Sequence, residues 1–153
     1  MRNVLIFVID GCAPEYLTKE PAPDIYELAK QDGSFFKTVL AAVPTVTNVN
    51  HACILSGLPP ERTHVIGNYY YDPETGKQGF IESKGFMKAP TILEKYKAAG
   101  GKTALLTVKG KILEVFREGV DIGISVQKPD SGLLSRLGLS APPQVQSPES
   151  SRW

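Results

Sequence analysis

The chain has 153 residues, the length of one ordinary domain, and this is enough to bury a hydrophobic core. Hydrophobic residues make up 42% and charged residues 22%, so the composition is that of a globular protein and excludes general disorder. The formal net charge of +1 argues against a nucleic-acid polymer as partner, because such proteins cluster Lys and Arg on one face. No apolar run is long enough to span a bilayer and no secretory signal is recognisable, so we expect a cytoplasmic protein without a membrane partner.

The beginning of the chain predicts a buried strand. Residues 4–9 (VLIFVI) form a continuous apolar run rich in β-branched side chains, the pattern of a parallel strand covered on both faces. Asp10 follows at the carboxyl end of this strand, where ligands gather in open α/β sheets. A carboxylate there suits a metal ion, and a turn-forming Asp is an equally good interpretation of the same position.

Helices and strands alternate along most of the remaining chain. Helices are predicted at 23–31, 47–56, 90–99, 112–117 and 132–137, and strands at 34–43, 102–108 and 120–126. A turn is predicted at 58–63, and an aromatic hairpin with its turn at 72–76 interrupts the alternation. The alternation favours an α/β fold, with a mainly parallel sheet flanked by helices.

Residues 44–57 (PTVTNVNHACILSG) predict a loop that enters a helix ending at Gly57. Thr47 and Asn48 stand at the predicted helix start, where both residue types commonly cap free backbone N–H groups. The same helix start offers N–H donors and the positive end of the helix dipole to a phosphate or another anion. Capping is the common role of a Thr at this place, and the alternative is a nucleophile that attacks phosphorus.

Polar residues from several predicted loops would meet at the carboxyl edge of the sheet. They are Asp10, Thr47, Asn68, Lys109 and Lys111. Metal activation would lower the pKa of an alcohol, an Asn would donate to a phosphoryl oxygen, and a Lys would neutralise an anionic substrate. The ordinary alternatives are a turn Asn and solvated lysines at a helix start.

Neither histidine is a convincing general base for an alcohol. His51 lies four residues after Thr47 and shares its helix face, but a single His in an apolar helix is usually a hydrogen-bonded packing residue. His64 lies in a predicted turn. A metal ion is therefore the better candidate for activating the alcohol.

Three motifs in order resemble one family. Asp10-Gly11, residues 44–61 and residues 64–74 resemble the type I phosphodiesterase/nucleotide pyrophosphatase branch of the alkaline phosphatase superfamily. Within that branch, residues 103–111 (TALLTVKGK) look most like the phosphonoacetate hydrolases. The resemblance covers about residues 1–130 and implies an alkaline-phosphatase-like α/β fold.

The resemblance also implies roles for five residues. Thr47 would be the metal-bound nucleophile and Asp10 a metal ligand in a site that holds two zinc ions, or another divalent metal. Asn68 would hold a nonbridging oxygen, and Lys109 and Lys111 would approach the carboxylate or phosphonate of a small anionic substrate. The implied reaction is cleavage of the C–P bond of a phosphonoacetate-like compound. The alternatives are a nucleotide pyrophosphatase/phosphodiesterase, and a non-catalytic α/β module that binds an anion.

The sequence departs from this family in its metal ligands. The family places the remaining Asp and His ligands in a longer C-terminal part, and this chain has no histidine after His64. We therefore expect residues 1–140 to be the N-terminal part of a catalytic domain that is incomplete at its C-terminus, and the Pro/Ser-rich residues 141–153 to be a tail or interrupted linker. Such a chain is expected to be inactive or very weak, and to self-associate through its exposed edge.

Overall fold

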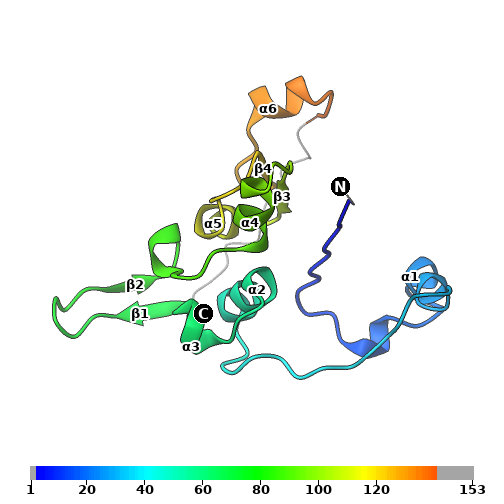
Figure 1. The fold of residues 1–153 in the computed structure, drawn as a ribbon, viewed down its shortest axis with the longest axis horizontal. Coiled ribbons are helices and arrows are strands. Elements are labelled where there is room, and N and C mark those ends of the chain that lie inside the picture. Colours follow the sequence, from blue (N-terminus) through cyan, green and yellow to red (C-terminus); the bar gives the residue numbers. More distant parts are fainter. Residues whose placement is uncertain (1–2, 141–153) are drawn as a thin grey trace. The chain divides into compact units, whose positions relative to one another are not determined.

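The computed structural model describes residues 3–140, which fall into two compact units divided after Ala41. The first unit holds the short 3-10 helix η1 (Pro14–Tyr16) and the helix α1 (Pro23–Leu28), drawn in blue in Figure 1. Pro23 occupies the first position of α1, where its missing N–H costs nothing and its fixed φ suits the helix. The predicted helix at 23–31 is thus confirmed, three residues shorter.

The two strands predicted in the first unit are wrong. Residues 4–9 and 34–43 carry no regular secondary structure, and their side chains are exposed, Leu5 to 83% and Leu40 to 96%, except for the half-buried Ala42. A strand is stable when a neighbouring strand pairs its N–H and C=O groups and when other side chains cover its apolar faces. Residues 3–41 contain no strand to provide that pairing, and none of them is buried.

The second unit, drawn from cyan to orange in Figure 1, contains both sheets. Its elements are α2 (Thr47–Ser56), α3 (Pro60–Thr63), β1 (Tyr69–Tyr71), β2 (Gln78–Phe80), η2 (Lys84–Phe86), α4 (Ile92–Ala98), β3 (Ala104–Thr107), α5 (Gly110–Val115), β4 (Ile122–Ser125) and α6 (Ser131–Arg136). The later helices, the hairpin and the strand–helix–strand order are confirmed, and with them the α/β class. The predicted turn at 58–63 contains the single helical turn α3.

The first sheet is the antiparallel hairpin β1–β2, in which Tyr69 pairs with Phe80 and Tyr71 with Gln78. Its turn is built around Asp72, whose carboxylate accepts hydrogen bonds from the backbone N–H of Glu74 (3.0 Å) and the hydroxyl of Thr75 (2.5 Å). The bond from the hydroxyl is the main reason that the pKa of Asp72 is lowered. The predicted turn at 72–76 is therefore an Asx-type turn.

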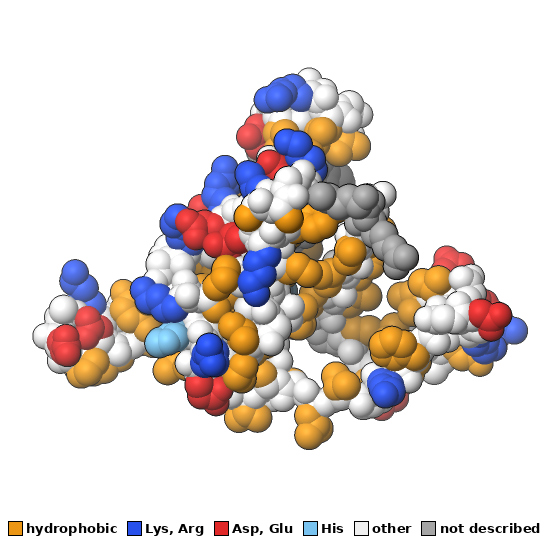
Figure 2. All heavy atoms as spheres, viewed as in Figure 1, with side chains coloured by type: hydrophobic (Ala, Val, Ile, Leu, Met, Phe, Trp, Pro, Cys, Tyr) orange, Lys and Arg blue, Asp and Glu red, His pale blue; other side chains and the backbone are white. Residues whose placement is uncertain are grey.

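The second sheet is the parallel pair β3–β4, in register from Ala104–Ile122 to Thr107–Ser125, with α5 as the crossover. The prediction that β3 is buried is wrong, since Leu106 is 68% exposed and the side chains on the other face, Leu105 and Thr107, are only half-buried. Residues 3–140 supply no third strand to this sheet and no helix layer that covers Leu106. Figure 2 shows apolar side chains, in orange, at the surface of the molecule.

The hydrophobic core lies between α2, α5 and the end of the hairpin. It consists of Val49, Ala52, Leu55, Val65, Ile81, Ile112, Val115 and Phe116. The α2 members recur every three residues, so one face of α2 is buried. Because the core packs α2 against α5 and Ile81, it also fixes where the start of α2 stands relative to those elements.

The helix α4 has the best-defined start among the described elements. The Thr91 hydroxyl accepts from the backbone N–H of Glu94 (3.2 Å), and the Glu94 carboxylate accepts from the backbone N–H of Thr91 (2.6 Å), which is a capping box. No helix of residues 3–140 is both long enough and apolar enough to cross a membrane. The predicted tail at 141–153 lies outside the described residues.

Candidate functional site

The N-cap residue of α2 provides no side-chain cap. The capping position is Val46, with extended backbone (φ −109°, ψ 156°) and no side-chain cap, and Thr47 is the first helical residue. The expectation that Thr47 or Asn48 caps the helix is therefore wrong, because only the residue with the extended backbone can direct its side chain back at the free N–H groups. At its other end α2 stops at Gly57 with φ +72°, as predicted.

Asn68 supplies the missing cap from outside the helix. Its Oδ1 accepts a hydrogen bond of 3.1 Å from the backbone N–H of Asn48, twenty residues away in sequence. This bond places the Asn68 amide beside the first turn of α2, next to Thr47. Within residues 3–140 the Nδ2 of Asn68 has no hydrogen-bond acceptor, so this N–H₂ group can donate to an anion at the helix start.

Asn48 fastens the same turn to the hairpin. Its side chain is 1% exposed, and its Nδ2 donates to the carbonyl of Ile81 (3.1 Å). The backbone N–H of Ile81 in turn donates to the carbonyl of Asn68 (2.9 Å). The three residues form a closed set of hydrogen bonds, so the start of α2, Asn68 and the end of β2 hold one fixed arrangement.

Two more side chains hold the backbone on either side of Thr47. The Oδ1 of Asn50 accepts from the backbone N–H of Ala42 (2.9 Å), and its Nδ2 donates to the carbonyls of Ala42 (3.3 Å) and Val46 (3.2 Å). His51 places its Nδ1 2.8 Å from the carbonyl oxygen of Thr47, and its ring stacks on Phe116. The prediction that His51 is a hydrogen-bonded packing residue is confirmed.

The two predicted lysines stand at the start of α5. Lys109 is the residue before α5, directly beyond the carboxyl end of β3, and both lysines are half-buried. The Nζ of Lys111 lies 5.7 Å from the centre of the Phe80 ring, which makes an edge contact with Tyr69 (5.3 Å). This contact places Lys111 against β2, so Lys111 is not a fully solvated lysine.

Asp10 lies in the other compact unit, in an exposed turn of residues 3–41. The strand that was to present it is not formed. In the second unit Thr47 and Asn68 therefore lie together at the start of α2, and Lys109 and Lys111 lie at the start of α5, whereas Asp10 belongs to the first unit.

The described residues do not complete a zinc site. A catalytic zinc ion takes about three protein ligands, and residues 3–140 contain no group of three or more His, Cys, Asp or Glu side chains placed to hold a metal. His51 is engaged with the Thr47 carbonyl, and His64 lies exposed at the end of α3 in a left-handed conformation (φ +63°).

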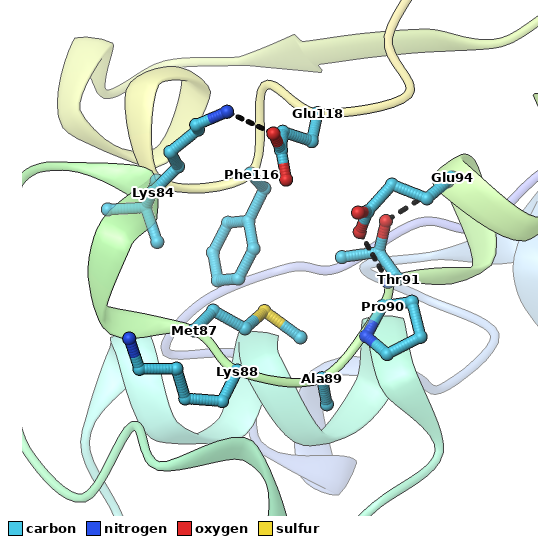
Figure 3. A pocket seen from close by; sticks show the side chains of 10 residues that line it. Lys84, Met87, Lys88, Ala89, Pro90, Thr91, Glu94, Phe116 and Glu118 are labelled. Carbon is cyan, nitrogen blue, oxygen red and sulfur yellow. Dashed lines mark hydrogen bonds and ion pairs between the residues drawn. The ribbon is translucent and has the colours of Figure 1, made fainter.

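A separate hollow of about 250 Å³ lies between η2, the start of α4 and the end of α5 (Figure 3). Met87, Pro90 and Phe116 line it, and an ion pair between Lys84 and Glu118 stands beside it. Its lining includes none of the predicted site residues. It is distinct from the site at the start of α2.

The sequence analysis did not predict the hydrogen bonds of Asn50, and it predicted that Asn48 caps the helix, whereas Asn48 bonds to Ile81. Both stand in the helical run 47–51 (TNVNH), although Asn is a weak helix former whose side chain competes for backbone groups. Two such residues within one turn are a signal that side chains bond to backbone there. What the signal does not give is the partner, because Ile81 and Ala42 are distant in sequence.

The second unit is thus an α/β structure in which a hydroxyl-bearing residue and an amide donor lie side by side at a helix start, an arrangement that can bind a phosphate-like anion.

Comparison with known proteins agrees with this class. Residues 4–144 match the type I phosphodiesterase/nucleotide pyrophosphatase family, so the chain belongs to this family. The chain is 35% identical over 81 residues to human ectonucleotide pyrophosphatase/phosphodiesterase family member 1. This match covers 52% of the chain and 9% of the human protein. It is 30% identical over 93 residues to an uncharacterised pyrophosphatase/phosphodiesterase of Schizosaccharomyces pombe, covering 61% and 19% respectively.

The fold is also similar to a solved enzyme. Phosphonoacetate hydrolase from Sinorhizobium meliloti, crystallised in complex with phosphonoformate and also with phosphonoacetate, superposes with a TM-score of 0.56 and 28% identity. The match covers 67% of this chain and 29% of that enzyme. The chain thus spans less than a third of each of these relatives.

Proposed function

We propose that the protein containing this chain is a hydrolase that cleaves a small phosphonate, of the phosphonoacetate class, with Thr47 as nucleophile. The observation that carries the proposal is the 3.1 Å bond from the Asn48 N–H to Asn68, which places an amide donor beside Thr47 at a helix start. The similarity to phosphonoacetate hydrolase, a protein crystallised with phosphonoacetate, supports the choice of substrate.

The proposed chemistry follows from these groups. The Thr47 hydroxyl loses its proton to solvent as its oxygen forms a bond to phosphorus, while the C–P bond breaks and the carbon leaves with its electron pair; the proton that the carbon later takes up balances the one lost. The carboxylate next to that carbon takes up the developing charge, and Lys109 or Lys111 stabilises it. Protonation of the carbon gives acetate, and water then releases phosphate from Thr47. Throughout, the Nδ2 of Asn68 donates to a nonbridging oxygen on phosphorus.

Zinc dependence, with Asp10 and Thr47 as ligands, is part of the proposal for the whole protein. These two residues give too few ligands for one catalytic zinc ion, so the remaining ligands would come from outside residues 3–140. The measurement is the zinc content of the purified protein after dialysis, with and without the substitution Asp10→Asn.

The test of the nucleophile uses the longest natural polypeptide that contains residues 1–153. Release of acetate and phosphate from phosphonoacetate is expected, and Thr47→Ala should lower it by on the order of a thousandfold or more. Thr45→Ala, the same change two residues earlier at an exposed position, is the matched control and should keep full activity. Turnover that survives Thr47→Ala, or no turnover of any phosphorus substrate, would overturn the proposal.

A second candidate is a nucleotide pyrophosphatase/phosphodiesterase. The names of the human and fission-yeast relatives favour it, and so does the exposed pair formed by Tyr69 and Phe80 beside Asn68, since aromatic faces stack on bases. Thr47-dependent hydrolysis of an aryl phosphodiester in preference to phosphonoacetate would select this function. Binding of phosphate without any turnover would instead indicate a non-catalytic anion-binding module.

A further inference from the structure

The backbone of Thr47 is held by a side chain that does not belong to the anion site. In an α-helix the carbonyl of Thr47 accepts from the backbone N–H of residue 51. Here the Nδ1 of His51 lies 2.8 Å from the same oxygen. A carbonyl oxygen only accepts, so the His51 nitrogen must carry the proton and donate it, and a carbonyl has lone pairs for both bonds.

His51 is itself held in place by the core. Its ring stacks on Phe116 with centroids 6.3 Å apart and an interplanar angle of 22°. Phe116 is 1% exposed and belongs to the cluster that joins α2 and α5. The position of the Thr47 carbonyl is therefore tied to a buried ring as well as to the first turn of the helix.

This tie matters because a helix start is where a helix normally frays. The N-cap residue Val46 provides no side-chain cap, and the cap from Asn68 satisfies only the N–H of Asn48. Asn50 holds the carbonyl of Val46 on one side (3.2 Å), and His51 holds the carbonyl of Thr47 on the other. The hydroxyl-bearing residue thus has a fixed backbone on both sides.

Resting on the proposed role of Thr47 as nucleophile, we propose that His51 is a positioning residue, which sets the aim of the Thr47 hydroxyl through the Thr47 carbonyl and takes no part in proton transfer. A small misplacement of a nucleophile costs rate far more than it costs binding. The signature is therefore a lower kcat at an unchanged KM.

Two substitutions separate the hydrogen bond from the packing. His51→Phe keeps a ring on Phe116 and removes the donor, while His51→Asn removes the ring and keeps a donor close to the Nδ1 position. His51→Phe should lower kcat about tenfold with KM unchanged, and His51→Asn should recover most of that loss. His64→Asn is the matched control: His64 is exposed and left-handed, a conformation that Asn tolerates, so its kinetics should not change.

Two readouts do not depend on turnover. The chain has two histidines, so ¹⁵N NMR of the imidazoles, assigned with His64→Asn, should show His51 locked with its proton on Nδ1. Hydrogen exchange of the His51 backbone amide should be about tenfold faster in His51→Phe than in the parent, because the first turn frays more.

The outcomes distinguish this inference from the function on which it rests. A His51 ring protonated on Nε2 alone, unchanged amide exchange in His51→Phe, or equal kinetic losses in the Phe and Asn variants would overturn the positioning role while leaving Thr47 as nucleophile. Activity that survives Thr47→Ala would overturn the function itself, even where the NMR and exchange results come out as expected.

Discussion

The two compact units use apolar sequence in opposite ways. In residues 3–41 the most apolar run of the chain, 4–9, is exposed, whereas in residues 42–140 a mixed sequence such as α2 buries Val49 and Ala52 completely. Apolar composition is therefore not what decides burial. The second unit buries its side chains because helix, hairpin and crossover each offer a face to the others, whereas residues 3–41 contain two short helices and no strand.

The hydrogen bonds differ in the same way. Backbone bonds in the first unit link neighbours, as from Tyr16 N–H to the carbonyl of Ala13 and from Ser34 N–H to that of Gln31. In the second unit side chains bond to backbone across long stretches of sequence, as Asn48 does with Ile81 and Asn68 with Asn48. Long-range bonds of this kind tie elements together, and short-range bonds only shape turns.

The sharpest test of this contrast makes one chemical change in both units. Phe116→Ala removes a ring that is 1% exposed and should lower the free energy of unfolding by about 3–5 kcal/mol. Phe35→Ala removes a ring that is 81% exposed and should change it by less than about 0.5 kcal/mol. Urea denaturation followed by circular dichroism measures both. A cost at Phe35 equal to that at Phe116 would mean that residues 3–41 are packed in solution.

The second prediction separates the roles of the two polar atoms of the Asn68 side chain, Oδ1 and Nδ2. Asn68→Asp keeps the oxygen that accepts from the Asn48 N–H, so stability should be almost unchanged, but it replaces the Nδ2 donor with a charge that repels an anion. Turnover should fall at least a hundredfold, as for loss of one oxyanion donor. Asn68→Ala loses the cap as well and should also cost about 1 kcal/mol of stability. Equal stabilities for the Ala and Asp variants would show that the cap contributes nothing.

The third prediction concerns the capping box of α4; the helix α1 of the first unit has no side-chain cap. Thr91→Ala breaks the capping box of α4 and should cost about 1 kcal/mol of unfolding free energy. The control is Thr18→Ala, at an exposed position before α1, where the capping residue Ala22 makes no side-chain cap; the change should be within about 0.5 kcal/mol. Thermal unfolding of the two variants compares them directly. Equal losses would assign the effect to threonine itself and not to the cap.

The elements that sequence predicts well are those whose signals are local. The helix α2 with its end at Gly57 and the turn at Asp72 both depend on residues within a few positions of each other. The strands at 4–9 and 34–43 are the counterexample, since a strand depends on a partner that its own residues do not specify.

In the candidate site, too, local features were predictable and long-range contacts were not. Thr47, Asn68 and the two lysines are predicted from motifs in the sequence, and the structure places Asn68 beside the first turn of α2, which holds Thr47. The hydrogen bonds that fix the start of α2 were not predictable, because Asn48 and its acceptor Ile81 are 33 residues apart in the sequence. The sequence also favours Thr47 as a cap, and the extended backbone of Val46 excludes that role.

The smallest expected effect is the pH dependence of a long-range contact in the second unit. The carboxylate of Asp121 accepts from the backbone N–H of Thr103 (2.9 Å) and pairs with Lys97 (3.1 Å), and chiefly the bond from Thr103 holds the pKa of Asp121 below its ordinary value of 3.8. A carboxyl whose pKa is lower in the folded than in the unfolded chain stabilises the fold above the unfolded value. This stabilisation is lost as the pH falls through the folded pKa.

Acid unfolding between neutral pH and about pH 2 therefore tests the Asp121 contact. Asp121→Asn should abolish the part of the acid-induced loss of stability below pH 4 that comes from Asp121. Lys97→Met should abolish a smaller part of that loss, because Lys97 is a lesser cause of the lowered pKa than Thr103. Lys95→Met makes the same change on the exposed side of α4 and should leave the curve unaltered. If the Lys97 and Lys95 variants unfold along the same curve, the ion pair is screened by solvent and Thr103 alone sets the pKa of Asp121.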